Sequence, residues 1–160
     1  MLQPLDPRYV PLERAVGFVT TGIIAVLGLG ALGFVAMFTS GGLVLLGLLA
    51  AAWTAVIAGL AWLALRWPEY EYRRARYDLG DDAVEIHGGV MWRHVYRVPR
   101  SRVQHTDVAQ GPLERRYGLA TLVLHTAGAK HARVELGGLA HATAIALRDR
   151  LLPREHADAV

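Results

Sequence analysis

Residues 15–65 read AVGFVTTGIIAVLGLGALGFVAMFTSGGLVLLGLLAAAWTAVIAGLAWLAL and contain no Asp, Glu, Lys, Arg or His. A membrane-spanning helix needs about 20 apolar residues, so this run of 51 residues is too long for one helix and suits two. The turn-forming cluster Thr39-Ser40-Gly41-Gly42 falls near its middle. The run therefore predicts a transmembrane hairpin over residues 15–66, with helices at about 15–38 and 43–65.

Two alternatives fit this run less well. A buried hairpin in a soluble protein would have to be enclosed by the other 109 residues, which are too few. A cleaved signal peptide has an apolar core of only about 7–15 residues, although Ala50-Ala51-Ala52 offers a small-residue cleavage site. We therefore expect an integral membrane protein with two spans.

Arginines flank the apolar run on both sides, and the predicted turn has none. Cytoplasmic flanks of membrane helices carry an excess of Lys and Arg. We therefore expect both termini in the cytoplasm of a bacterium and the hairpin in its cytoplasmic (inner) membrane, with residues 1–14 as a cytoplasmic N-terminal segment. The flanking arginines are Arg8 and Arg14 before the run and Arg66, Arg73, Arg74 and Arg76 after it.

Small residues recur at every fourth position of the second predicted helix, at Ala51, Ala55 and Gly59. Such rows let helix backbones approach closely in a membrane. We expect this row to pack inside the hairpin, with self-association or a membrane partner as the alternative. The spacing of Gly28, Gly30 and Gly33 matches GxGxxG, but no strand precedes it, so dinucleotide binding is rejected.

The second half of the chain has a different composition. Residues 67–160 hold 14 of the 17 Lys and Arg, 12 of the 14 Asp and Glu, and all seven His. Residues 67–152 are expected to form one small domain, followed by a tail at 153–160. Its formal charge of only 14 − 12 = +2 gives no reason to expect nucleic-acid binding. The absence of cysteine excludes disulfides, cysteine-zinc sites and thiol catalysis.

Alternating apolar and polar residues in this half predict a series of short strands, bounded by turn residues. A final amphipathic helix at 140–152 has Ala144, Leu147 and Leu151 on one stripe and ends at Pro153. The pattern indicates an α+β protein in which a PH-like barrel or sandwich, capped by the C-terminal helix, follows the hairpin. Periodicity alone leaves other small β folds open. The predicted strands are 70–79, 83–87, 90–98, 103–110, 119–126 and 131–136, after a link at 67–69.

Residues 98–120, VPRSRVQHTDVAQGPLERRYGLA, resemble the bacterial PH-like domain of the YdbS-like family of membrane proteins. Supporting pieces are Tyr77-Asp78-Leu79, Gly88-Gly89-Val90 and His125-Thr126-Ala127-Gly128. The resemblance covers about residues 10–152 and includes the two preceding helices. It implies a membrane-tethered binding role without an enzymatic reaction, and a role in envelope stress or in resistance to membrane-active peptides.

Arginines are the candidate binding residues. Arg100 and Arg102 lie in one predicted turn and Arg115 and Arg116 in another, so adjacent turns would form a patch for a phosphate or an acidic partner segment. The alternative is that they form salt bridges to Glu114 and Asp107. Arg73, Arg74 and Arg76 would attract anionic lipid, or they only fix the topology.

Histidines offer a weaker case for chemistry. His105 and Asp107 share one strand face and would suit a hydrolase, but no activated serine, oxyanion-hole motif or phosphate loop accompanies them. We therefore expect no enzyme. We also expect no metal and no cofactor, because the histidines form no HxH or HxxxH pair. The five strand histidines considered are His87, His94, His105, His125 and His131.

The function predicted from the sequence is a membrane-anchored, non-enzymatic scaffold. Its cytosolic PH-like domain would assemble with another membrane protein that carries PH-like domains, or with a second copy of itself. Contacts would use the small-residue helix faces and an exposed strand edge or turn. The main alternative is sensing of anionic lipid headgroups by the basic turns.

Overall fold

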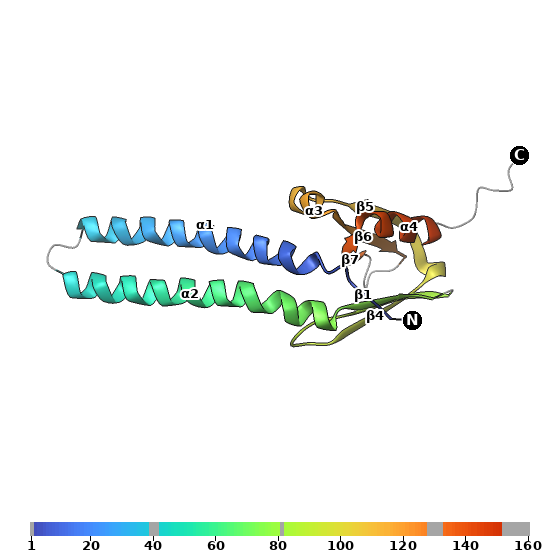
Figure 1. Cartoon of the computed structure of the whole chain (residues 1–160), viewed down its shortest axis with the longest axis horizontal. Helices are drawn as coiled ribbons and strands as arrows, with labels where there is room; N and C mark the ends of the chain where they lie inside the picture. The colour runs from blue at the N-terminus through green and yellow to red at the C-terminus, as the bar shows by residue number, and fades with distance from the viewer. Residues whose placement is uncertain (1, 39–41, 81, 128–132, 152–160) are drawn as a thin grey trace, which may run out of the picture. The chain divides into compact units, whose positions relative to one another are not determined.

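A computed structural model describes residues 2–38, 42–80, 82–127 and 133–151 of the protein. The chain forms two compact units, and Figure 1 shows the order of their elements. One unit is a helical hairpin of residues Glu13–Glu69, and the other combines Met1–Leu12 with Tyr70–Val160. The hairpin turn expected at 39–42, apart from Gly42, and the tail at 153–160 lie outside the described residues.

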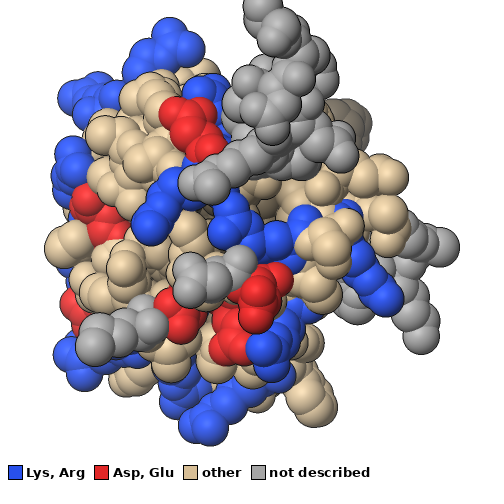
Figure 2. Space-filling view, turned by 90° about the vertical axis from the view of Figure 1, so that its right-hand side faces the viewer, with Lys and Arg blue, Asp and Glu red and all other residues tan. Residues whose placement is uncertain are grey.

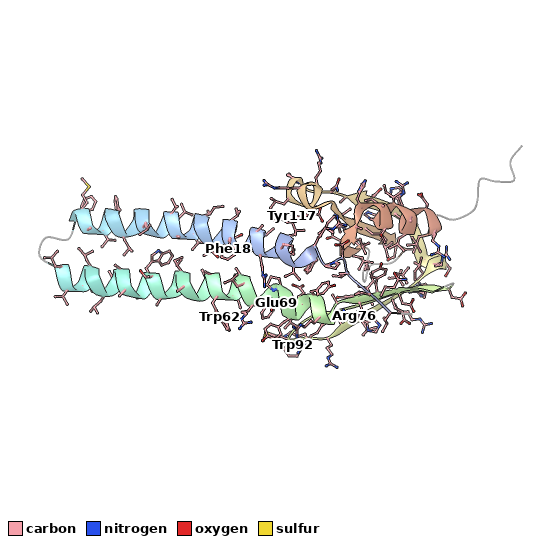
Figure 3. The ribbon with its side chains drawn as sticks, viewed as in Figure 1. Phe18, Trp62, Glu69, Arg76, Trp92 and Tyr117 are labelled. Carbon is pink, nitrogen blue, oxygen red and sulfur yellow. The ribbon has the colours of Figure 1, made fainter. Side chains whose placement is uncertain are left out.

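Two long apolar helices, α1 (Tyr9–Phe38) and α2 (Leu43–Arg74), confirm the predicted hairpin. Each has an apolar stretch long enough to cross a membrane. Their large apolar side chains are exposed, as at Val26 (70%), Leu27 (69%) and Trp62 (62%; Figure 3). The core helix of a soluble protein would bury such side chains, so the soluble-hairpin alternative is wrong.

Both helices are longer than expected: α1 begins at Tyr9 instead of about residue 15, and α2 extends beyond its predicted end at 65. The second helix continues through Pro68 to Arg74, where a link and then a strand from Tyr70 were predicted. Proline removes one helical hydrogen bond, and Arg14 contacts the same part of the helix. Arg14 Nε donates to the carbonyl of Leu65 at 3.1 Å, and its Nη2 lies 2.5 Å from Glu69 Oε1. This ion pair joins α1 to α2.

The two helices pack through residues other than the predicted row. A Cβ built on Gly17 would lie 2.7 Å from Ala64 Cβ, and one on Gly28 would lie 2.0 Å from the Trp53 ring. These glycines therefore mark the contact between α1 and α2. Packing of the row Ala51, Ala55 and Gly59 inside the hairpin is a wrong prediction, because all three residues are exposed and a Cβ on Gly59 would meet nothing within 4 Å.

Gly28→Ala is expected to destabilise the hairpin by about 1–2 kcal/mol, because the added methyl overlaps the Trp53 ring. Gly30→Ala is the matched control, since nothing lies within 4 Å of its Cβ position. Thermal unfolding of the detergent-solubilised chain measures the difference. Equal melting temperatures for the two variants would contradict this packing.

The domain contains two antiparallel sheets and a C-terminal helix. One sheet has the order β1-β2-β3-β4, with β1 (Gln3–Pro4), β2 (Arg76–Leu79), β3 (Ala83–Gly88) and β4 (His94–Pro99). The other has the order β5-β6-β7, with β5 (Val103–Ala109), β6 (Leu119–Thr126) and β7 (Arg133–Ala140). Helix α4 (His141–Leu151) packs on this second sheet and buries Ala144, Leu147 and Leu151, as predicted (Figure 1).

The residues before the hairpin belong to this domain. Gln3 and Pro4 pair with Tyr77 and Arg76 of β2, and Leu5 is buried in the core. The hairpin is therefore inserted between the first two strands, a feature that sequence analysis missed by treating residues 1–14 as a separate segment. Because β1 and β2 pair, the segments that precede and follow the hairpin belong to one folded domain.

Asp6 and Arg8 form the junction between β1 and α1. Arg8 donates from its backbone nitrogen and from Nε to Asp6 Oδ1, both at 2.9 Å. The side-chain hydrogen bond from Arg8 lowers the pKa of the Asp6 carboxyl. The stabilisation that this ionised carboxylate provides is therefore present at neutral pH and lost as the pH falls through its lowered pKa.

Several strand boundaries differ from the predictions. β4 begins at His94 instead of residue 90, so Val90–Arg93 form a loop. β7 continues through Gly137 and Gly138, where the sheet was expected to stop. Its register against β6 shifts here, between Ala120 and Leu122, and Gly138 has a φ of 72°. The glycine pair therefore forms a β-bulge within the strand.

Candidate functional site

The predicted basic patch does not form. Arg100 and Arg102 lie in the short 3-10 helix η1 (Arg100–Arg102), just before β5, whereas Arg115 and Arg116 lie on α3 (Pro112–Tyr117), just after it. Seven extended residues separate the pairs by about 20 Å. Arg100 Nη2 donates to the carbonyl of Arg150. Figure 2 shows a face of the protein on which basic and acidic side chains are interspersed.

Side chains of the family-like segment around α3 make hydrogen bonds that hold its local structure. Glu114 accepts a hydrogen bond from the Gly111 backbone at 2.6 Å and one from Thr121 Oγ1 at 2.8 Å. Gln110 Nε2 donates to the Leu119 carbonyl at 2.7 Å, and Gly118 ends the helix in the left-handed conformation. In the described structure Glu114 thus bonds to Gly111 and Thr121, and not to an arginine as the alternative expected. This segment fixes a turn of the fold.

Histidine and aspartate meet on the outer face of β5 and β6. Asp107 Oδ1 lies 2.9 Å from His105 Nε2, and its Oδ2 lies 3.5 Å from His125 Nε2. His105 and Asp107 side chains are 65% and 55% exposed. A hydrolytic site needs a cavity that holds substrate, whereas these side chains lie exposed on the sheet surface. His131 lies outside the described residues.

A cleft separates the two sheets where β4 faces β7. It has a volume of about 430 Å³ and is lined by Ile86, Tyr96 and Val134, together with charged or polar groups of His94, Arg133 and Glu135. A second cavity of about 250 Å³ continues along β4, between Val95 and Pro99 on one side and Thr126 and Val134 on the other. The cleft thus follows most of β4.

Strand β4 is the outer strand of its sheet in the described structure. Its Val95 side chain is 60% exposed, while Val98 of the same strand is buried. An outer strand presents unpaired backbone donors and acceptors to an incoming strand. Strand β5, predicted at 103–110, is also an outer strand. The apolar edge at β4 was missed, because 90–98 was expected to be a continuous strand.

The loop between β3 and β4 is apolar at its tip and basic at its base. Met91 and Trp92 are 77% and 76% exposed (Trp92 is labelled in Figure 3). Arg74 Nη1 donates to the carbonyl of Val90 and ties the loop to the end of α2. Arg76 donates to the carbonyls of Tyr72 and Ala75, so it caps that helix, while Arg73 is exposed.

Comparison with known proteins agrees with this architecture. Residues 16–155 match the family model described as Bacterial PH domain. The UPF0699 transmembrane protein YdbS of Bacillus subtilis (strain 168) is 31% identical over 86 residues, which are 50% of this chain and 54% of that protein. The chain thus spans about half the length of this curated relative. No solved structure matches the chain.

These matches agree with the resemblance found in the sequence. They also agree with the structure, which has two apolar helices and a two-sheet domain with a C-terminal helix. The transmembrane relative and the exposed apolar surface of the hairpin identify a membrane protein. The chain belongs to the bacterial PH domain family, as a YdbS-like protein with two membrane-spanning helices.

Proposed function

We propose that the protein is a non-enzymatic membrane scaffold whose PH domain binds an extended segment of another membrane protein along β4. The observation that carries this proposal is the outer strand β4 beside a cleft of about 430 Å³. Added strands bind through backbone hydrogen bonds, and pockets for alternate side chains give specificity. The cleft supplies such pockets at Tyr96 and Val134.

The partner in this proposal is a membrane protein with PH domains of its own, or a second copy of this chain. The outward row Ala51, Ala55 and Gly59 gives a second contact surface within the membrane, because small residues allow close helix approach. We place the assembly at the cytoplasmic face of the inner membrane, on the basis of the flanking arginines. We also propose a role in envelope stress, as the family resemblance implies.

The geometry favours binding over catalysis. His105 and Asp107 lie on an open strand face, where water and solutes have free access. A hydrolytic site gains its rate from positioned groups in a cavity that excludes water. Exposed imidazole and carboxylate groups on a sheet surface do not provide that setting.

Val95→Lys is expected to reduce recovery of the partner from native membranes by about tenfold or more, since a charge on an edge strand blocks strand addition. Gln104→Lys is the matched control, because Gln104 is exposed on the outer strand of the other sheet. Quantitative mass spectrometry of the purified complexes compares the two variants. Equal recovery with both lysine variants would contradict docking on β4.

A further inference from the structure

A small basic cavity lies beneath the β3–β4 loop. It has a volume of about 260 Å³ and is lined by two arginines, two histidines and loop backbone, without a carboxylate side chain in its wall. Its lining residues are Arg74, His87, Gly88, Gly89, Arg93, His94 and Val95. Arginine and histidine side chains in a confined space favour an anion with several acceptor oxygens, such as a phosphate group.

Two polar groups of this cavity have no hydrogen-bond partner in the described structure. His87 Nε2 is buried and makes no hydrogen bond within the described structure. Glu85 Oε2 lies 3.7 Å from it, beyond hydrogen-bond distance, and the other oxygen of Glu85 faces Arg97 Nε at 3.4 Å. The exposed guanidinium of Arg93 has no hydrogen bond or ion pair to the described part of the chain. A buried polar atom without a partner is costly unless something binds it.

Apolar side chains at the loop tip indicate the source of the phosphate. Met91 and Trp92 are largely exposed beside this cavity, and tryptophan favours the interface between membrane and water. Exposed apolar side chains next to a basic cavity favour a lipid headgroup over a soluble phosphate as its ligand.

From this placement we infer that the β3–β4 loop is a lipid-binding site: Arg74, Arg93, His87 and His94 hold the phosphate of an anionic phospholipid headgroup while Met91 and Trp92 enter the interface. This site lies at the start of β4, whose His94 and Val95 line it, and its ligand is a lipid headgroup instead of a partner strand. It also differs from the predicted patch of Arg100, Arg102, Arg115 and Arg116.

Labelling at position 91 tests the inference in the full-length chain. The protein has no cysteine, so Met91→Cys accepts an environment-sensitive fluorophore at one position. The labelled protein is reconstituted into vesicles of phosphatidylcholine alone, or of equal parts phosphatidylcholine and phosphatidylglycerol, with a quencher attached to the lipids near the headgroups. We expect the emission to shift to the blue and to be quenched by the lipid-attached quencher, with both effects larger in the anionic vesicles.

Arg93→Gln is expected to shift the loop–membrane equilibrium in anionic vesicles by about fivefold toward the free loop. Arg93→Lys should retain most of the binding, because it keeps the charge. Arg102→Gln, an exposed arginine in η1, should leave quenching unchanged. A label that stays in water in both vesicles, or equal effects of the two glutamine variants, would overturn the inference.

Inorganic phosphate distinguishes a soluble ligand from a lipid. If the cavity serves a lipid headgroup, millimolar phosphate in phosphatidylcholine vesicles should leave the label emission unchanged. Two results together would assign the cavity to a soluble phosphate and overturn its assignment to lipid. They are a phosphate-dependent change in label emission that is lost in Arg93→Gln, and equal quenching in the two vesicle types.

Discussion

Leu5→Ala is expected to destabilise the PH domain by about 2–5 kcal/mol, although Leu5 precedes the first membrane helix. Its side chain is only 6% exposed and belongs to the same core as Val84, Leu122 and Leu139. The neighbouring backbone is held as well, since Asp6 N donates to the Gly138 carbonyl at 2.9 Å. Truncation removes the buried side chain and leaves a cavity in the core.

Leu2→Ala is the control for this prediction, because Leu2 is 53% exposed in the same short segment. Its effect should stay within about 0.5 kcal/mol. Urea titration of the detergent-solubilised full-length chain, read by proteolysis of the domain, measures both variants. Similar midpoints for Leu5→Ala and the unmodified chain would show that residues before the hairpin are not part of the folded core.

Gly89→Ala is expected to cost about 2–4 kcal/mol, because two effects add at this position. The residue has a φ of 97°, which residues with a Cβ rarely adopt. A Cβ would also lie 1.8 Å from the carbonyl oxygen of Trp92, so the loop backbone has to move. The same movement should abolish the lipid-dependent quenching of a label at position 91.

Gly88→Ala provides the comparison from the adjacent residue. A Cβ on Gly88 meets nothing within 4 Å, and its φ lies outside the left-handed region. Its cost should therefore stay near the ordinary alanine-for-glycine range of about 1 kcal/mol or less. The urea titration used for Leu5 ranks the two variants, and a Gly88→Ala variant less stable than Gly89→Ala would contradict the loop conformation.

Local patterns in the sequence were sufficient to predict the hairpin and much of the domain. The charge-free run of 51 residues requires two spans whatever follows it. The strand at 119–126 is a mostly apolar run bounded by turn residues, and its bounds were predicted correctly. The stripe of Ala144, Leu147 and Leu151 likewise has the helical period, and all three residues are buried.

Features that depend on tertiary contacts were not predictable from these patterns. Gln3 and Pro4 are too few to show a period, so β1 becomes recognisable only through its pairing with β2. Tyr70 and Tyr72 alternate with charged residues as in a strand, yet α2 continues to Arg74. Its last turn gains hydrogen bonds from Arg76 to the carbonyls of Tyr72 and Ala75.

The candidate site depends on relations between distant segments. Arg100, Arg102, Arg115 and Arg116 are close in sequence, but β5 separates the two pairs. In contrast, Arg74 and Arg93 line one cavity although the whole of β2 and β3 lies between them. Sequence spacing does not indicate that Arg74 and Arg93 lie close together. The Met91-Trp92 pair, which is exposed in the structure, was assigned to a strand.

Photo-crosslinking from position 95 in native membranes is the most direct measurement of partner docking. A photoreactive amino acid replaces Val95 on the edge of β4, and a second variant carries it at Ala146, an exposed residue of α4. We expect position 95 alone to give a discrete crosslinked product with a membrane protein or a second copy of the chain. No product from position 95, or the same product from both positions, would contradict a scaffold that docks its partner along β4.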